Sequence, residues 1–139
     1  ALQSASGRFP SSLPSKVTIP CSGNIAAVHI LGGVAAFGFP TNRDESASLI
    51  VRCHYEDGTS VDHELINGKH IANYQEKTDV PGSKFAIEAD GKQIRYLKIS
   101  VDATNSLKSL ELVKGDNRST PLVFAITVEF AAGHEADAG

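Results

Sequence analysis

ASLIVRCHYEDGTSVDHEL, residues 47–65, has the pattern of a β-hairpin. Apolar residues occupy every second position of the first arm (Leu49, Val51, Cys53, Tyr55) and recur in the second arm (Val61, Leu65). Asp57-Gly58 lies between the arms and predicts a type I′ turn, because glycine adopts a positive φ without strain. One face of this hairpin is therefore expected to be buried and the other, with Arg52 and His54, to face solvent.

The rest of the chain alternates short apolar segments with turn residues. Besides the hairpin arms, strands are predicted at 15–20, 25–31, 85–90, 94–102, 107–113 and 122–130. The last segment, LVFAITVEF, is apolar on one face and on half of the other, which predicts a central strand. No long amphipathic helix pattern occurs. About eight short strands at this spacing predict an all-β domain of two packed antiparallel sheets, a jelly-roll β-sandwich.

The pattern predicts one domain, residues 15–130, between two segments with little core of their own. Residues 1–14 are rich in Ser, Pro and Gly and predict a lead-in arm or linker, and the small, acidic residues 131–139 predict a flexible tail. The glycine-rich segment 32–40 predicts a tight apolar loop. Residues 66–84 predict a long surface loop of the kind that carries binding residues. A chain that begins with Ala and lacks Met favours a processed product or a domain excised from a larger exported protein.

Composition excludes two classes of partner. The net charge is −3 and no basic cluster occurs, whereas nucleic-acid binding requires clustered Lys and Arg. No apolar run approaches the roughly 20 residues of a membrane helix, so membrane insertion is not expected.

The two cysteines, Cys21 and Cys53, are too few for a disulfide framework. They are interpreted as reduced thiols, with a single disulfide as the alternative.

The titratable residues form no catalytic or metal-binding motif. His29, His54, His63 and His70 lack the spacing of zinc ligands, and no Gly-x-Ser-x-Gly nucleophile motif occurs. The acidic residues of the hairpin are expected on any exposed face. The sequence therefore predicts a protein that is not an enzyme and has no cofactor. A structural Ca²⁺ stays open, with Asp116 and Asn117 or Asp102 and Asn105 as its candidate ligands.

Several segments carry a family resemblance in their order along the chain. VTIP (17–20) and VHIL (28–31) precede VRCHYEDG (51–58), which is followed by NGKHIANY (67–74) and AITV (125–128). This order resembles a galactose-binding-like module of large secreted or envelope proteins of environmental bacteria. The resemblance implies a jelly-roll β-sandwich that serves as a non-catalytic accessory module of proteins acting on polysaccharides or the cell surface. It also implies a secreted or cell-envelope location.

The function predicted from this resemblance is carbohydrate binding. The candidate ligand-binding residues are Tyr74, Asn73, His70, Arg52 and His54. Tyr74 stands where such modules often have Trp, and a Tyr ring can stack on a sugar while polar neighbours bond its hydroxyls. Tyr55 is either a second ligand residue or part of the core, and its register with Val51 favours the core.

The alternative prediction is a structural or protein-interaction domain that packs against neighbouring domains of a parent protein. Such a domain would expose an apolar patch, for which Phe37 and Phe39 are the candidates.

Overall fold

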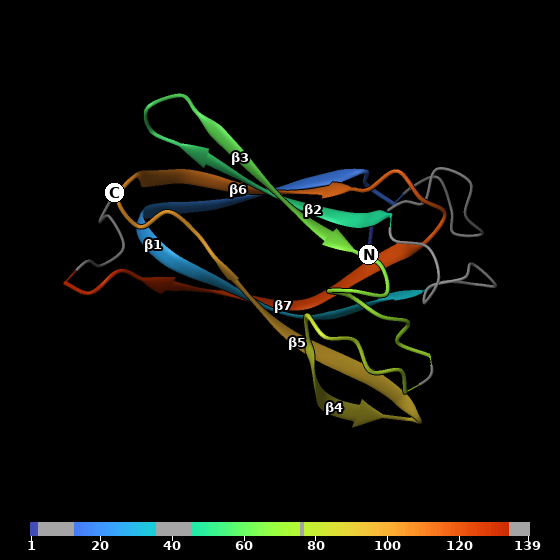
Figure 1. The fold of residues 1–139 in the computed structure, drawn as a ribbon. Coiled ribbons are helices and arrows are strands. Elements are labelled where there is room, and N and C mark those ends of the chain that lie inside the picture. The colour runs from blue at the N-terminus through green and yellow to red at the C-terminus, as the bar shows by residue number, and fades with distance from the viewer. Residues whose placement is uncertain (3–12, 36–45, 76, 134–139) are drawn as a thin grey trace.

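The computed structural model describes residues 1–2, 13–35, 46–75 and 77–133, which form seven β-strands and no helix (Figure 1). The strands are β1 (Lys16–Ala35), β2 (Ala47–Tyr55), β3 (Ser60–Ile66), β4 (Lys84–Ala89), β5 (Lys92–Ser100), β6 (Ser106–Lys114) and β7 (Thr120–Phe130). Antiparallel ladders join them in the order β3-β2-β6-β1-β5-β4, and β7 also pairs with β1. Figure 1 shows a curled sheet in which β6 and the start of β1 face β7. The predicted all-β, antiparallel class is thus confirmed.

Some sequence predictions lie outside the described residues. These concern most of the lead-in arm, the apolar pair Phe37 and Phe39, and the tail beyond Gly133. At the start of the chain, Leu2 is buried and its backbone N–H donates to the carbonyl oxygen of Pro121 on β7 (3.1 Å). The first residues therefore pack against β7.

β1 is the longest strand, and it changes partners along its length. Residues 16–24 pair with β6, whereas 25–35 pair with β7 and, in part, with β5. The register shifts between Pro20 and Gly23, where Gly23 has a φ of 117° that strains other residues. The prediction of two separate strands here was wrong, because this bulge redirects the backbone without ending the strand. Seven strands therefore replace the eight predicted.

The glycine-rich segment that follows is also strand rather than loop as far as Ala35. A Cβ added to Gly32 would overlap the carbonyl oxygen of Leu122 on β7. The predicted loop over residues 32–35 was therefore wrong. The glycines at this position allow the close approach of a neighbouring strand.

The central hairpin is confirmed, with Cys53 opposite Val61 across β2 and β3. Its turn is not type I′, because Gly58 has a positive φ (87°) but Asp57 does not. Instead Asp57 Oδ1 accepts hydrogen bonds from the backbone N–H (2.9 Å) and hydroxyl (2.6 Å) of Thr59. The β4–β5 turn has positive φ at both Asp90 (50°) and Gly91 (74°), as a type I′ turn requires.

β7 is an edge strand in the part of the chain that the structure describes, since it pairs with β1 alone. The prediction of a central strand was wrong. The register shifts where Leu31 pairs with Ala125 and Gly32 with Val123, which leaves Phe124 as a bulged residue with 54% of its surface exposed. The bulge ends the strict alternation of inward and outward side chains that the sequence pattern assumed.

The core lies inside the curl of the sheet. Its buried apolar side chains include Ile25, Val28, Ile30, Leu49, Val51, Cys53, Leu97, Leu107 and Leu110. Tyr55 is 4% exposed and belongs to this core, as its register favoured. Cys21 is half-buried, both cysteines are free thiols, and burial raises the pKa of each. Neither thiol is therefore activated as a nucleophile at neutral pH.

Candidate functional site

The ligand residues predicted from the sequence lie in two parts of the structure. Arg52 and His54 are half-buried on the solvent-facing side of β2. Arg52 bonds Asp62 twice (Nε–Oδ1 2.7 Å, Nη2–Oδ2 3.1 Å) and donates to Glu111 Oε1 (3.1 Å). His54 Nδ1 lies 3.2 Å from Ser60 Oγ. The hydrogen bond from Arg52 lowers the pKa of Asp62. These groups therefore satisfy one another on an open strand face, where ion pairs contribute little to stability.

His70 and Asn73 lie between β3 and β4, and both bond the backbone. His70 Nδ1 accepts a hydrogen bond from the N–H of Ile66 (3.0 Å), and burial lowers the pKa of this imidazole. Asn73 is 9% exposed, and its Oδ1 accepts a hydrogen bond from the N–H of Gln75 (3.0 Å). Both side chains thus shape the loop that carries them.

Tyr74 is half-buried against the sheet. Its N–H donates to the carbonyl oxygen of Val34 (3.0 Å), and its own carbonyl accepts a hydrogen bond from the N–H of Gln93 (2.8 Å). A Cβ added to Gly33 would lie 2.9 Å from Tyr74 Cβ. The loop is therefore fixed between β1 and β5 at this residue.

A hollow on the outer face of the sheet combines residues of β1, β5 and β7. Its volume is about 220 Å³, and it is lined by His29, Ile30, Leu31, Tyr96, Ala125 and Thr127. The Tyr96 hydroxyl lies 2.7 Å from His29 Nδ1, and the ring planes lie within 14° of each other with centroids 5.8 Å apart. Thr127 is opposite His29 in the β1–β7 register. We call this surface the His29–Tyr96 hollow.

Sequence reasoning missed the His29–Tyr96 hollow, although a signal for it was present. Leu97 and Ile99 occupy alternate positions of the predicted strand 94–102, and both are buried. Side chains alternate along a strand, so Tyr96 had to face outward.

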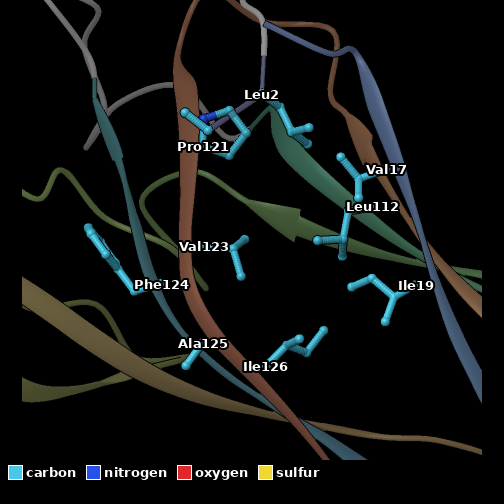
Figure 2. Close-up of a pocket in the computed structure, with 10 residues that line it drawn as sticks. Leu2, Val17, Ile19, Leu112, Pro121, Val123, Phe124, Ala125 and Ile126 are labelled. Atoms are coloured by element: carbon cyan, nitrogen blue, oxygen red, sulfur yellow. The ribbon is translucent and has the colours of Figure 1, made fainter.

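A second hollow is an apolar groove between β7 and the first half of β1. Its volume is about 350 Å³, and its lining includes Leu2, Val17, Ile19, Leu112, Val123 and Ile126. In Figure 2, Val123 and Ile126 point from β7 toward the side chains of β1 and β6, whereas Phe124 lies on the other side of the ribbon. Every lining residue is apolar, so the groove suits an apolar group and not acid–base chemistry.

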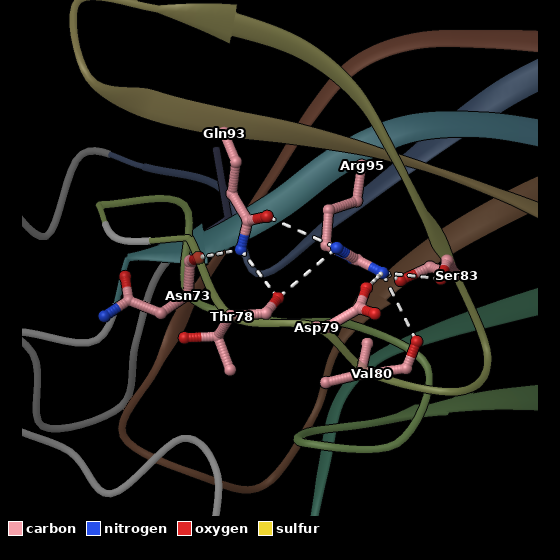
Figure 3. Close-up of polar contacts among 7 residues, drawn as sticks. All are labelled: Asn73, Thr78, Asp79, Val80, Ser83, Gln93 and Arg95. Carbon is pink, nitrogen blue, oxygen red and sulfur yellow. Dashed lines mark hydrogen bonds and ion pairs between the residues drawn. The ribbon is translucent and has the colours of Figure 1, made fainter.

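A buried guanidinium organises the segment between β3 and β4 (Figure 3). The side chain of Arg95 is 2% exposed. It donates to the carbonyl oxygens of Thr78, Val80 and Ser83 and to the side chains of Asp79, Ser83 and Gln93. The shortest of these bonds, 2.5 Å and 2.8 Å, both reach Ser83. Gln93 Nε2 donates to the carbonyl oxygen of Asn73 (2.9 Å). Two polar side chains at inward positions of β5 therefore hold the loop against the sheet.

The oxygen atoms considered as Ca²⁺ ligands accept hydrogen bonds within their own loops. Asp102 Oδ1 accepts from the N–H (2.9 Å) and hydroxyl (2.6 Å) of Thr104. Asn117 Oδ1 accepts from the N–H (3.0 Å) and hydroxyl (2.6 Å) of Ser119. Over residues 13–35, 46–75 and 77–133, no three His, Cys, Asp or Glu side chains gather as a metal-binding group.

Lys114 lies at the end of β6 beside a buried polar cluster. Its Nζ donates to the carbonyl oxygens of Gly115 (2.5 Å) and Asn117 (2.7 Å). Asn117 Nδ2 in turn donates to Ser48 Oγ (2.9 Å). Burial lowers the pKa of Lys114 to about 8.

This lowered pKa predicts a stability change at alkaline pH. Below about pH 8 the ammonium is charged in both states, and its burial disfavours folding; between about pH 8 and 10.5 only the unfolded state keeps the proton. The free energy of unfolding of the wild type, relative to Lys114→Met, is therefore expected to rise across this interval. Urea unfolding of both proteins at a series of pH values measures the difference. A difference in the free energy of unfolding between the two proteins that stays constant with pH would contradict the expectation.

Comparison with protein-family models, with curated proteins and with solved structures finds no match for this chain. The described residues contain no helix long and apolar enough to cross a membrane. The function must therefore be argued from the site itself.

Proposed function

We propose that this chain is a non-catalytic, carbohydrate-binding accessory module of a larger exported bacterial protein, secreted or held in the cell envelope. We further propose that the curled sheet is a galactose-binding-like jelly roll of two packed layers. The partner change along β1 supports this, since β6, β2 and β3 follow its first half, whereas β7, β5 and β4 group around its second half.

The His29–Tyr96 hollow is the observation that carries the proposal. A pyranose presents an apolar C–H face, which packs on an aromatic ring, and a rim of hydroxyls, which needs hydrogen-bonding groups. Tyr96 supplies the ring. His29 Nδ1 already bonds the Tyr96 hydroxyl, so Nε2 and the hydroxyl of Thr127 are the groups available to sugar hydroxyls. The hollow thus offers both kinds of contact at an open strand face.

Binding to a panel of polysaccharides and oligosaccharides tests this function. The wild type is expected to bind at least one glycan saturably. Tyr96→Leu is expected to weaken that binding about tenfold, because losing roughly 55 Å² of buried apolar contact with the ring costs about 1.4 kcal/mol. Tyr74→Leu is the comparison variant, since the sequence pointed to Tyr74. Thermal unfolding checks that both variants fold.

Two results would contradict the proposal. Loss of binding in Tyr74→Leu with Tyr96→Leu unaffected would favour the loop between β3 and β4 as the site. Absence of binding across a broad panel would remove the carbohydrate function itself.

The second candidate function is a structural or interaction domain that packs against neighbouring domains of the parent protein. The apolar groove favours it, because a 350 Å³ hollow with only apolar lining lies beside Phe124, whose surface is 54% exposed. An exposed apolar surface of this kind is typical of interfaces. A negative glycan panel would make this candidate the leading one.

A further inference from the structure

We infer that the His29–Tyr96 hollow selects an acidic saccharide, one that carries a carboxylate or a sulfate group. The inference rests on the proposed function and adds the class of ligand. It is carried by two lysines that the strand register places beside the two rings.

The register puts both lysines on the face of the hollow. Lys84 is the antiparallel partner of Tyr96 across β4 and β5, and Lys98 is the partner of His29 across β5 and β1. Side chains of directly opposed residues project from the same face of a sheet, with Cβ atoms about 4.5–5.5 Å apart. Each ring of the hollow therefore has a lysine as its directly opposed cross-strand neighbour.

The charges of this face are not balanced by carboxylates. Lys84 is exposed and forms no ion pair within the described residues. Lys98 Nζ lies 3.9 Å from Glu129 Oε2, and both side chains are about half exposed (49% and 52%), so water weakens this contact. The residues that line the hollow include no Asp, Glu, Lys or Arg. Two lysines and one glutamate give the surface around the hollow a positive charge, although the net charge of the chain is −3.

The buried Arg95 fixes the backbone that carries Lys84. Arg95 bonds both the hydroxyl (2.8 Å) and the carbonyl oxygen (2.5 Å) of Ser83, the residue directly before Lys84. Ser83 is 8% exposed, whereas all of β4 is exposed. The backbone of β4 is therefore anchored at the residue before Lys84, which keeps the Cα of Lys84 opposite Tyr96.

The expected mode of binding follows from these positions. The C–H face of one sugar unit packs on the Tyr96 ring, and its acidic substituent lies at the rim toward Lys84 and Lys98. Charge-assisted hydrogen bonds from two ammonium groups then favour an acidic sugar over its neutral counterpart. Because these groups are exposed, the preference should weaken as salt rises.

Matched probes test the inference. Oligogalacturonate, its methyl ester and a sulfated galactan oligosaccharide are titrated by calorimetry against the wild type at low and physiological ionic strength. The wild type is expected to bind one or both acidic probes about five- to tenfold more tightly than the methyl ester. The two acidic probes distinguish carboxylate from sulfate recognition.

Two variants locate the effect. In Lys84→Gln/Lys98→Gln, acidic probes should bind about five- to tenfold more weakly while the methyl ester is unchanged, since each exposed ion pair contributes roughly 0.2–1 kcal/mol. Lys108→Gln, at an exposed position of β6, is the control and should bind like the wild type. Tyr96→Leu should weaken the binding of every probe that the wild type binds.

The outcomes separate the inference from the function on which it rests. Neutral glycans bound as tightly as acidic ones, with loss in Tyr96→Leu, would overturn the acidic preference and leave carbohydrate binding intact. The acidic preference would also be overturned if Lys108→Gln weakened the binding of acidic probes as much as Lys84→Gln/Lys98→Gln does, or if Tyr96→Leu left that binding unchanged. Either result would indicate non-specific charge attraction. Binding of no glycan at all would overturn both.

Discussion

Arg95→Leu is expected to lower the free energy of unfolding by about 3–5 kcal/mol, because hydrogen bonds to a charged group contribute roughly 1.5–3 kcal/mol each and their loss leaves buried acceptors unpaired. Arg95 donates to the carbonyl oxygens of Thr78, Val80 and Ser83, and its side chain is only 2% exposed. Leucine fills part of the volume but cannot donate to any of them. The segment between β3 and β4 should therefore lose its attachment to β5.

Two measurements check this prediction. Denaturant unfolding gives the free energy, and limited trypsin digestion reports whether the bonds after Lys77 and Lys84 become accessible. Asp79→Asn is the matched control. The Asp79 side chain is 93% exposed, so its ion pair with Arg95 is expected to contribute less than about 1 kcal/mol. A loss below about 1 kcal/mol in Arg95→Leu would show that the loop is held by other contacts.

The hairpin and the strand alternation could be predicted because they depend on neighbouring residues. In β2 the apolar positions Leu49, Val51 and Cys53 are all buried, as a period of two requires. In β5 the alternating residues Leu97 and Ile99 are likewise buried. Such patterns are local, so a single sequence is sufficient to recognise them.

The bulges could not be predicted, because they depend on strands far away in the chain. Phe124 is displaced where Gly32 of β1 lets β7 approach closely, and no residue near Phe124 signals this. The partners of Arg95 could not be predicted either. Alternation with Leu97 and Ile99 places Arg95 on the inward face, but the carbonyl groups that pair with it there lie 12 to 17 residues away.

The candidate site was missed for a related reason. Sequence reasoning gave the site to the loop residues Tyr74, Asn73 and His70, because loops often carry binding groups, together with Arg52 and His54 of the hairpin. In the structure His70 and Asn73 bond their own loop, whereas the half-buried rings of the hollow lie on strands β1 and β5. His29 and Tyr96 are 67 residues apart, so only the strand order brings them together.

Gly115→Ala is expected to lower the free energy of unfolding by at least about 3 kcal/mol, at or above the usual range for overpacking, because the obstacle is backbone. Gly115 follows β6, and its N–H donates to the carbonyl oxygen of Ser48 (2.9 Å). An added Cβ would overlap the carbonyl oxygen of Ala47 and lie 2.5 Å from its carbonyl carbon. Neither atom can rotate away as a side chain would, so β2 and the start of the β6–β7 connection must separate.

The separation would also break the buried polar cluster next to it. Ser48 Oγ accepts from Asn117 Nδ2 (2.9 Å) and bonds Ser119 Oγ (2.9 Å), and both serines are fully buried. Gly58→Ala is the control, since nothing lies within 4 Å of its added Cβ and only its φ of 87° opposes alanine. That strain costs about 1–2 kcal/mol. Urea unfolding should therefore rank Gly115→Ala well below Gly58→Ala in stability, and equal losses would mean that β2 and the β6–β7 connection can shift apart at little cost.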